Sequence, residues 1–355
     1  MIRFRSPRFV FLSALLPGAV LLAGCAPGEK KPALTPDSPQ VKAFAPLPAV
    51  MESAANPVTE EKVKLGRMLY YDPRLSKSQE ISCNTCHLLD NYGVDNEPTS
   101  DGHKGQRGDR NSPTVYNAAG HFAQFWDGRA PDVEEQAKGP VLNPVEMAMP
   151  DEASVVKVLK SIPGYVEAFR AAFPDEKDPV TFDNMAKAIG AFERKLVTPD
   201  RWDKFLKGDA SALSDAELAG LQAFLDANCQ TCHMGAYLGG TMFQKLGVVK
   251  PWPDQKDLGR YQVTKNEADK MMFKVPSLRN VAKTDPYFHD GSVPTLEEAV
   301  AKMAEYELGK ELTEEQIASI VTFLNALTGE IPKDYIAEPK LPPSTAKTPK
   351  PDLSD

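Results

Sequence analysis

Histidine and cysteine are scarce in this sequence of 355 residues, which contains five of each. That leaves too few spare ligands, at unsuitable spacings, for zinc sites that need four ligands per metal. Strand-like alternation of apolar and polar residues is also scarce, so the apolar pattern favours helices. Basic residues are outnumbered, 41 against 49 acidic ones, and the net charge of −8 does not suit nucleic-acid binding. With 42% hydrophobic and 25% charged residues, the chain is neither fibrous nor wholly disordered.

The one long apolar run lies at the N-terminus, where it follows three arginines and extends from Phe9 to Ala23. A proline and a glycine interrupt it, and it is too short for a membrane span. It ends in Leu-Ala-Gly-Cys at 22–25, typical of a bacterial lipoprotein signal in which cleavage precedes Cys25 and its thiol is acylated. Ordinary signal cleavage nearby, with Cys25 a spare thiol, is the alternative, and both imply export. Loss of residues 1–24 would take the net charge from −8 to −11, because they hold three arginines and no acid.

The other four cysteines form two motifs of identical spacing. These are Cys83-Asn-Thr-Cys86-His87 and Cys229-Gln-Thr-Cys232-His233. An exported protein could use four cysteines in disulfides. However, C-x-x-C followed at once by histidine is the attachment signature of c-type haem. The thiols bond to the vinyl carbons and the next residue places its nitrogen under the iron, so the motifs predict two covalently bound haem c groups with His87 and His233 as proximal ligands.

The sequence also contains an internal duplication at a constant offset of 163 residues. The matching positions are Pro113 and Pro276, Asn117 and Asn280, Ala119 and Ala282, and Phe125-Trp126-Asp127-Gly128 with Phe288-His289-Asp290-Gly291. An amphipathic segment precedes each haem motif, at 60–71 and at 215–228. A cytochrome c domain has this layout, in which a helix is followed by the haem motif, a long loop and a second helix. We therefore expect a mainly α fold of two tandem class I cytochrome c-like domains, each with one covalently bound haem c.

Composition divides the chain into five segments. The flanks repeat Pro, Lys, Ala and Ser, which is typical of extended or disordered chain. We expect a lipoprotein signal peptide at 1–24, a Pro-rich tether at 25–49, an N-terminal haem domain at 50–200, a C-terminal haem domain at 201–336 and a disordered tail at 337–355. Apolar residues at helical spacing within the domains are expected to pack in the core.

From about Leu65 to Leu327 the chain resembles the bacterial di-haem cytochrome c peroxidases. In the first half the residues that carry the resemblance are 108–118 (GDRNSPTVYNA), 124–130 (QFWDGRA), 134–140 (EEQAKGP) and 143–147 (NPVEM). In the second half they are 275–281 (VPSLRNV) and 286–300 (PYFHDGSVPTLEEAV). The resemblance implies a peroxidatic haem in the N-terminal domain and an electron-transfer haem in the C-terminal domain.

The resemblance also implies roles for residues around the peroxidatic haem. His103, in a loop that can swing away, matches the removable sixth ligand of the iron. Glu146 matches the distal carboxylate that moves protons during O–O cleavage, a task that suits a buried acid of raised pKa. Gln136 matches a distal residue that forms hydrogen bonds in the same pocket. Taken on their residue types alone, His103 could be an exposed loop histidine and Glu146 a helix-capping acid.

In the C-terminal domain, Met303 matches the sixth iron ligand. Its duplicate position is Pro140, which cannot ligate, and this asymmetry favours one closed iron and one that can open. Trp126 matches a tryptophan between the haems that mediates electron transfer. Asn111, Thr284 and Pro286 match residues around a calcium ion, for which carbonyl and amide oxygens are suitable ligands. His121 has no role in the family pattern and stays unassigned.

The resulting hypothesis is a cytochrome c peroxidase that reduces hydrogen peroxide to water. Its donor would be a small periplasmic cytochrome c or cupredoxin, and it would be a periplasmic homodimer anchored to the membrane through lipidated Cys25. One alternative is a di-haem electron carrier, against which Glu146 and Gln136 argue because a carrier needs no distal acid–base pocket. The other is a partner-protein-modifying oxidase resembling the methylamine-utilisation di-haem enzymes, in which tyrosine replaces the methionine ligand. Met303 argues against it, although Tyr306 lies close by in the sequence.

Overall fold

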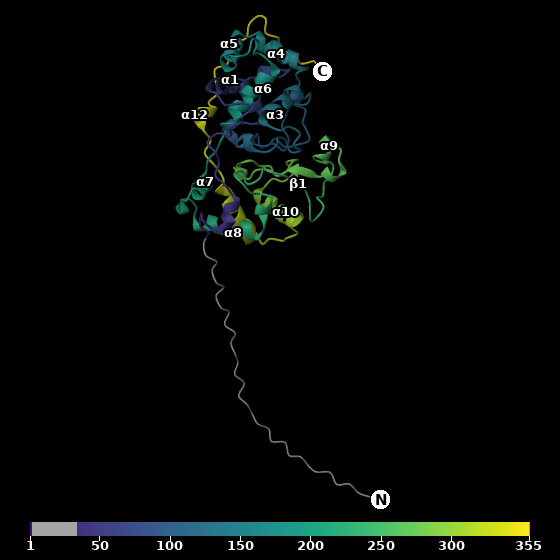
Figure 1. The fold of residues 1–355 in the computed structure, drawn as a ribbon. Coiled ribbons are helices and arrows are strands. Elements are labelled where there is room, and N and C mark those ends of the chain that lie inside the picture. The colour runs from purple at the N-terminus through teal and green to yellow at the C-terminus, as the bar shows by residue number, and fades with distance from the viewer. Residues whose placement is uncertain (2–33, 355) are drawn as a thin grey trace. The chain divides into compact units, whose positions relative to one another are not determined.

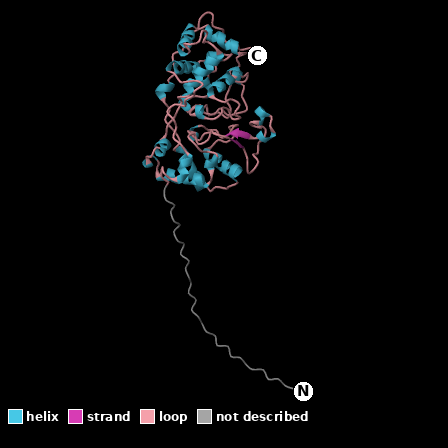
Figure 2. Ribbon diagram, viewed as in Figure 1, coloured by secondary structure: helices cyan, strands magenta, loops and turns pink. Residues whose placement is uncertain are grey.

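The computed structural model describes Met1 and residues 34–354, so the predicted signal peptide and the Cys25 lipidation site lie outside the described residues except for Met1. Helices joined by long loops make up the described body, with one short antiparallel sheet (Figures 1 and 2). Its α-helices are α1 (Glu60–Tyr71), α2 (Cys83–Cys86), α3 (Val133–Leu142), α4 (Glu152–Lys160), α5 (Pro163–Ala172), α6 (Phe182–Glu193), α7 (Arg201–Leu206), α8 (Asp215–Asp226), α9 (Tyr261–Thr264), α10 (Leu296–Leu308), α11 (Glu314–Asn325) and α12 (Lys333–Ile336). Strand β1 (Phe243–Lys245) pairs with β2 (Met272–Lys274). Within this described part, no helix has the length and apolar character needed to cross a membrane.

Each half contains one close helix crossing that a glycine makes possible. In the N-terminal half α1 packs on α6, and a Cβ at Gly66 would lie 1.9 Å from the Ala188 carbonyl oxygen. In the C-terminal half α8 packs on α11, and a Cβ at Gly220 would lie 2.2 Å from the Ser319 carbonyl oxygen. Both α1 and α8 are the helices that precede a haem motif. The predicted cytochrome c-like layout therefore holds in both halves.

The backbone repeats the duplication seen in the sequence. Asn117 and Asn280 both adopt the left-handed conformation, with φ of 61° and 60°. Phe125 and Phe288 do so as well, with φ of 65° and 70°. These unusual values recur at the offset of 163 residues, so the two loops after the haem motifs share one conformation and not only one sequence pattern.

The two halves meet at Thr198, on which the duplicated asparagines converge. The side-chain amides of Asn117 and Asn280 each donate a hydrogen bond of 2.9 Å to the Thr198 hydroxyl. The Thr198 backbone N–H in turn donates to the Asn117 side-chain carbonyl at 3.1 Å. One apolar core is formed by residues of 65–196 together with Ile336, and another by residues of 202–327 together with Leu34, Val41 and Phe44. Thr198 is fully buried at this junction.

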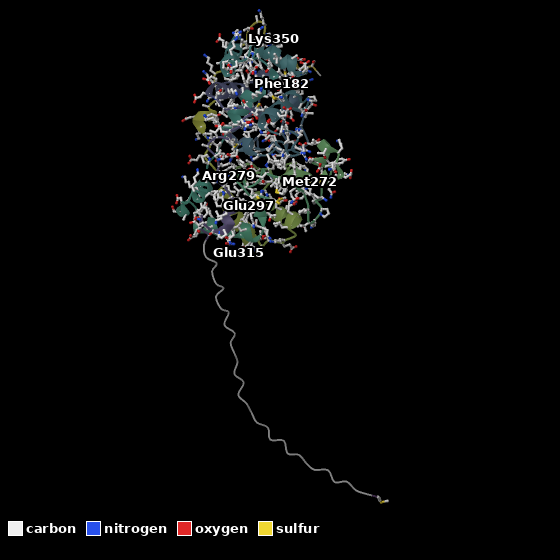
Figure 3. All side chains as sticks on the ribbon, viewed as in Figure 1. Phe182, Met272, Arg279, Glu297, Glu315 and Lys350 are labelled. Atoms are coloured by element: carbon white, nitrogen blue, oxygen red, sulfur yellow. The ribbon has the colours of Figure 1, made fainter. Side chains whose placement is uncertain are left out.

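A buried arginine ties the C-terminal motif 275–281 to α7. Arg279, labelled in Figure 3, is 1% exposed. Its guanidinium pairs with Asp200 and Asp203, each at 2.8 Å. Asp203 also accepts a hydrogen bond of 2.7 Å from the Leu47 backbone N–H. The pair of carboxylates and the guanidinium satisfy one another, as charges buried away from water must.

Both flanking segments differ from the sequence expectation. Within the predicted tether, Leu34, Val41 and Phe44 are buried in the C-terminal core, where the Phe44 ring meets the Trp202 ring edge-on at 5.3 Å. The predicted tail, residues 337–354, lies along the N-terminal half (Figure 1) and is hydrogen-bonded to it, for example from Arg74 to the Pro342 carbonyl at 2.9 Å. Proline-rich composition correctly indicated little secondary structure. It did not exclude docking through carbonyl groups, which proline retains.

Candidate active site

The C-terminal motif presents a histidine in the form that a metal ion requires. The His233 Nδ1 lies 3.0 Å from the Leu238 carbonyl, which can only accept, so Nδ1 carries the proton and Nε2 keeps its lone pair. Burial lowers the pKa of His233, which favours the neutral ring. This arrangement is the usual one for a metal-bound histidine, whose other nitrogen is held by a carbonyl.

A largely apolar cavity surrounds this histidine and fits a haem. It is lined by Cys229, Cys232, His233 and Met303, with apolar side chains such as Phe224, Phe288 and Leu296. Both cysteines are free thiols. Met303 projects from α10 (Leu296–Leu308), so the thiols, the imidazole and the predicted sixth ligand all border one space. Cysteine, histidine and methionine are the protein groups that attach and ligate haem c.

The N-terminal motif forms the short helix α2, and its thiols are also unpaired. Ser82 caps this helix, and the backbone N–H of His87 donates to the Cys83 carbonyl at 3.0 Å. The Tyr70 hydroxyl donates to the His87 carbonyl at 2.8 Å and so fixes the backbone of the motif. The His87 Nδ1 is buried and has no hydrogen-bond partner among the described residues. Burial lowers the pKa of His87, as for its counterpart in the other half.

His103 is buried with both ring nitrogens unpartnered. Its side chain belongs to a residue only 4% exposed, and neither Nδ1 nor Nε2 finds a hydrogen-bond partner within the described chain. Such orphaned polar atoms are rare in proteins because each costs free energy unless a partner is supplied. An iron ion is a suitable partner for one of them. The alternative of an exposed loop histidine is therefore wrong.

The loop that carries His103 is held at its neck and by hydrogen bonds to the turn at 144–146. At the neck, the Asp101 carboxylate accepts from Arg107 at 2.6 Å. At the tip, the His103 backbone N–H donates to the carbonyls of Val145 and Glu146, at 3.0 and 2.8 Å, and the Gln106 side chain donates to the Pro144 carbonyl at 3.4 Å. Gly102 is required there, because a Cβ would lie 2.0 Å from the Val145 oxygen. Among the described residues, neither apolar core includes a residue of this loop, so the loop can move without unfolding either core.

Glu146 lies in the turn after α3, beside the His103 backbone. Its Oε1 accepts a hydrogen bond of 2.7 Å from the Asn143 side-chain amide. Burial raises the pKa of Glu146, and the charge of Arg129 and the Asn143 bond offset part of that rise. The alternative of a helix-capping acid is wrong, since Glu146 follows the C-terminus of α3 and precedes the N-cap Asp151 of α4. A partly buried carboxyl of raised pKa can act as acid and as base.

Gln136 lies on α3 (Val133–Leu142), the helix that leads to Glu146. Its side chain is half-buried, and it precedes Asn143 by seven residues, which places the two on one side of the helix. No hydrogen bond joins the Gln136 amide to Glu146 in the described structure. The expected hydrogen-bonding role of Gln136 in the distal pocket stays a prediction, while Asn143 is the residue that contacts the Glu146 carboxylate.

Trp126 and its duplicate His289 both line the C-terminal cavity, although Trp126 belongs to the N-terminal half. Asn111 joins them: its carbonyl accepts from Trp126 Nε1 at 2.9 Å, and its N–H donates to the His289 carbonyl at 2.8 Å. The aromatic ring of one half therefore borders the cavity of the other. This is the position expected for a residue between two redox centres.

The expected calcium ligands lie on neighbouring loops. The Asn111 amide nitrogen donates to the Glu97 carbonyl at 3.0 Å, which leaves the side-chain oxygen Oδ1 for another partner. The adjacent Asn96 donates to the Asp285 carbonyl at 2.7 Å, between the other two expected ligands, Thr284 and Pro286. The described residues contain no group of three or more His, Cys, Asp and Glu that could hold a metal ion. A cation here would be bound by amide and carbonyl oxygens, which suit calcium.

Three residues near the sites were not singled out by the sequence analysis. Asn143 stood within the motif 143–147, but nothing in its residue type indicated a contact with Glu146. Arg129 stood in the motif 124–130, and its guanidinium lies 3.4 Å over the Phe125 ring. Lys274 lines the C-terminal cavity and donates to the Ala123 carbonyl at 3.0 Å, and burial lowers its pKa to about 8. The unassigned His121 lies against this amine, with 3.5 Å between Nδ1 and Nζ.

Comparison with known proteins agrees with these two sites. Residues 60–211 match the family described as di-haem cytochrome c peroxidase, and residues 217–328 match the cytochrome c family. The chain is 48% identical to the cytochrome c551 peroxidase of Pseudomonas aeruginosa, over 96% of this chain and 99% of that protein. It is also 48% identical to the cytochrome c551 peroxidase of Nitrosomonas europaea, over 84% of this chain and 88% of that protein. Among solved structures, a MauG-like protein associated with microbial copper homeostasis shares 30% identity with a TM-score of 0.71, covering 82% of this chain and 95% of that one.

Proposed function

Because the chain belongs to the di-haem cytochrome c peroxidase family, we propose that it reduces hydrogen peroxide to water at the N-terminal site, with electrons that enter at the C-terminal site. It is an oxidoreductase with peroxide as the acceptor and a reduced cytochrome as the donor. The observation that carries the site assignment is the buried imidazole of His103, which has no partner among the described residues and whose backbone N–H donates to the Glu146 carbonyl.

Haem bound through Cys83, Cys86 and His87 supplies an iron centre at which peroxide can bind and be reduced. The protein supplies the proton transfers. The Glu146 carboxylate accepts the proton of the bound peroxide and returns it to the departing oxygen, which leaves as water. Asn143 holds Oε1 during this transfer, and Arg129 places positive charge nearby. Burial keeps bulk water from competing for the same proton.

His103 gives the N-terminal site two states. With the imidazole in place, peroxide has no access to the position that the ring occupies. When the loop tip leaves the Val145–Glu146 carbonyls, the position opens while the Asp101–Arg107 neck remains closed. The C-terminal site lacks such a loop, because its sixth ligand Met303 projects from the helix α10. In a peroxidase with two haems, the site that can open would bind peroxide, and the site that stays closed would pass electrons to it.

The electron carrier is the weaker hypothesis because it leaves Glu146 unexplained. The partner-modifying oxidase is suggested by the MauG-like structural relative, and it would need a tyrosine at the second iron. Tyr306 is engaged elsewhere: its ring meets Trp252 edge-on at 5.0 Å, and Lys250 lies over it at 5.0 Å. Met303 lines the cavity instead. The side-chain positions therefore favour the peroxidase.

The cellular setting is part of the proposal. The lipobox at 22–25 and the haem motifs support a periplasmic protein tethered to the membrane through Cys25, with a small cytochrome c or cupredoxin as donor. Calcium held by Asn111, Thr284 and Pro286 would brace the segment that joins Trp126 to His289. We further propose a homodimer, as is common in this family.

The experiment that tests the function is the stoichiometry of peroxide-dependent oxidation of reduced cytochrome c by the calcium-loaded holoprotein. A peroxidase consumes two equivalents of reduced donor per peroxide and continues to turn over. Tyr306→Phe should leave both values unchanged, because this ring does not border the iron. Peroxide consumed without donor oxidation, or activity that depends on Tyr306, would support the oxidase, and no consumption at all would support the carrier.

A further inference from the structure

The C-terminal segment is docked along the N-terminal half at several points. Thr345 donates through its hydroxyl to the Ser161 carbonyl at 3.0 Å, and the Ser161 hydroxyl lies 3.0 Å from that of Thr348. Thr348 is 6% exposed. Figure 3 shows Lys350 at the end of the body where Phe182 lies, far from Glu315 of the C-terminal half. The segment therefore belongs structurally to the half that contains His103.

The end of this segment is bonded to the chain around Lys77. The Asp352 backbone N–H donates to the Lys77 carbonyl at 2.9 Å. The Lys77 ammonium donates to the Ser354 carbonyl at 2.9 Å, and the Gln79 side chain donates to the Pro349 carbonyl at 2.9 Å. Residues 349–354 thus form a short clasp on residues 77–79.

Lys77 is in turn bonded to the turn that contains Glu146. Its backbone N–H donates to the Met147 carbonyl at 2.8 Å. The neighbouring Glu146 carbonyl accepts from the His103 backbone at 2.8 Å. Two successive hydrogen bonds therefore connect the clasp to the turn, and the His103 N–H, shared between the carbonyls of Val145 and Glu146, connects the turn to the loop tip. Figure 1 shows the C-terminus beside the N-terminal half.

A salt bridge adds to the backbone bonds of the clasp. The Asp352 carboxylate lies 3.9 Å from the Lys77 ammonium. No other function of these last residues is evident from their contacts, because the exposed Leu353 side chain packs on nothing in the core.

We propose that residues 349–354 position the turn at 143–147 and, through it, the loop that carries His103. The inference rests on the proposed function, in which His103 leaves the iron. The clasp holds Met147 through Lys77, so it keeps Glu146 aligned and slows the departure of the loop tip from its two carbonyl partners. The residues of the clasp are positioning residues, since none borders the reacting atoms.

The test uses the holoprotein with residues 349–355 deleted and compares it with the full chain. The first readout is hydrogen exchange at the backbone amides of His103 and Lys77, measured in the oxidised state. Loss of the clasp should speed exchange at both about tenfold, because a lost hydrogen bond changes a local opening equilibrium by about that factor. The second readout is the rate of cyanide binding to the N-terminal iron. It is measured with only the C-terminal haem reduced, because in the proposed function the electron that enters there triggers the departure of His103, and it should also become about tenfold faster.

Leu353→Ala is the matched control, because the side chain is exposed and the backbone bonds remain. It should leave both readouts unchanged. If the deletion lowers the melting temperature, Asp352→Pro removes the single N–H donated to Lys77 and tests the same bond in the full chain.

Unchanged exchange in the folded deletion protein would overturn the proposal. Faster exchange without faster cyanide binding would overturn the claim that the clasp restrains His103. Failure of cyanide to bind to the half-reduced full-length protein would instead contradict the proposed function. The exchange measurement decides the positioning role in that case as well, because it needs no ligand to leave the iron.

Discussion

At the residue scale, the account depends on two side chains that a structural role alone does not explain. Neither ring nitrogen of His103 has a partner within the described residues, and Glu146 keeps a carboxyl partly buried with one amide donor. Each arrangement costs stability in the protein alone and is explained by a role of both residues at a reacting centre.

Removal of the His103 imidazole should open the N-terminal iron permanently. In His103→Ala the fully oxidised protein is expected to bind cyanide without prior reduction of the C-terminal haem. Absorption spectra should show a high-spin N-terminal iron and an unchanged C-terminal one. His121→Ala is the control, since His121 contacts Lys274 and not the N-terminal motif. A low-spin N-terminal iron in His103→Ala would contradict the ligand assignment.

The pH dependence should report Glu146. The reaction needs the carboxylate as the base, and burial raises the pKa of this group above its ordinary value of 4.5. As pH falls through the raised pKa the base becomes protonated, so kcat/KM should fall about tenfold per pH unit on the acid side, beginning above pH 4.5. Glu146→Gln should lose this acid limb of the pH profile, that is, the fall of kcat/KM on the acid side. A limb that persists unchanged in the variant would assign it to another group.

Sequence predicted these residues unequally well. The haem cysteines and proximal histidines follow from residue type and spacing, because covalent attachment permits little variation. His103, Glu146 and Met303 needed the family resemblance, since a loop histidine or a core methionine has no distinctive spacing. Asn143 was missed because its contact with Glu146 arises only when the chain turns after α3.

At the element scale, the crossing of α1 with α6 and that of α8 with α11 each depend on one glycine. Gly66→Ala or Gly220→Ala would force a Cβ to within about 2 Å of a facing carbonyl oxygen, so the helices must separate. We expect each variant to lose about 1–3 kcal/mol in urea unfolding, the usual cost of overpacking. Gly108→Ala is the control, because its Cβ would meet no atom within 4 Å. Equal stability of Gly66→Ala and Gly108→Ala would contradict the crossing.

Helices were predictable from the sequence where apolar spacing was regular, as in 60–71, 182–196 and 215–228. The packing of the C-terminal segment was not. Its contacts are made by proline carbonyls and threonine hydroxyls, which leave no apolar periodicity in the sequence. Composition predicts whether a segment forms helices, and it does not predict whether extended chain finds a surface to bind.

At the scale of the whole molecule, the Thr198 hydroxyl is one of the contacts that join the duplicated halves, and it is the one that both duplicated asparagines share. Thr198→Val keeps the shape of the side chain but leaves the amides of Asn117 and Asn280 without their shared acceptor. The expected loss is about 1–3 kcal/mol for each buried donor left unpaired, with the two halves unfolding less cooperatively. Thr322→Val, on the surface of α11, should change little. A single unchanged transition in Thr198→Val would show that the halves are held together by other contacts.

The duplication could be recognised in the sequence because residues with unusual backbone conformations recur at the constant offset of 163 residues. Asn117, Phe125 and their counterparts need positive φ, and asparagine tolerates it better than most residues. The sequence did not predict which residue the loops of Asn117 and Asn280 contact at the junction between the halves, since Thr198 lies outside both repeats.

The central claim is that Glu146 transfers protons during peroxide reduction, and its most direct test is the turnover of Glu146→Gln. The measurement is peroxide-dependent oxidation of reduced cytochrome c, compared with the wild type and with Glu135→Gln, which removes an exposed acid of α3. The account predicts a loss of about 10²–10⁴-fold in Glu146→Gln, with both haems still reducible, and no significant loss in Glu135→Gln. Wild-type turnover by Glu146→Gln would contradict it.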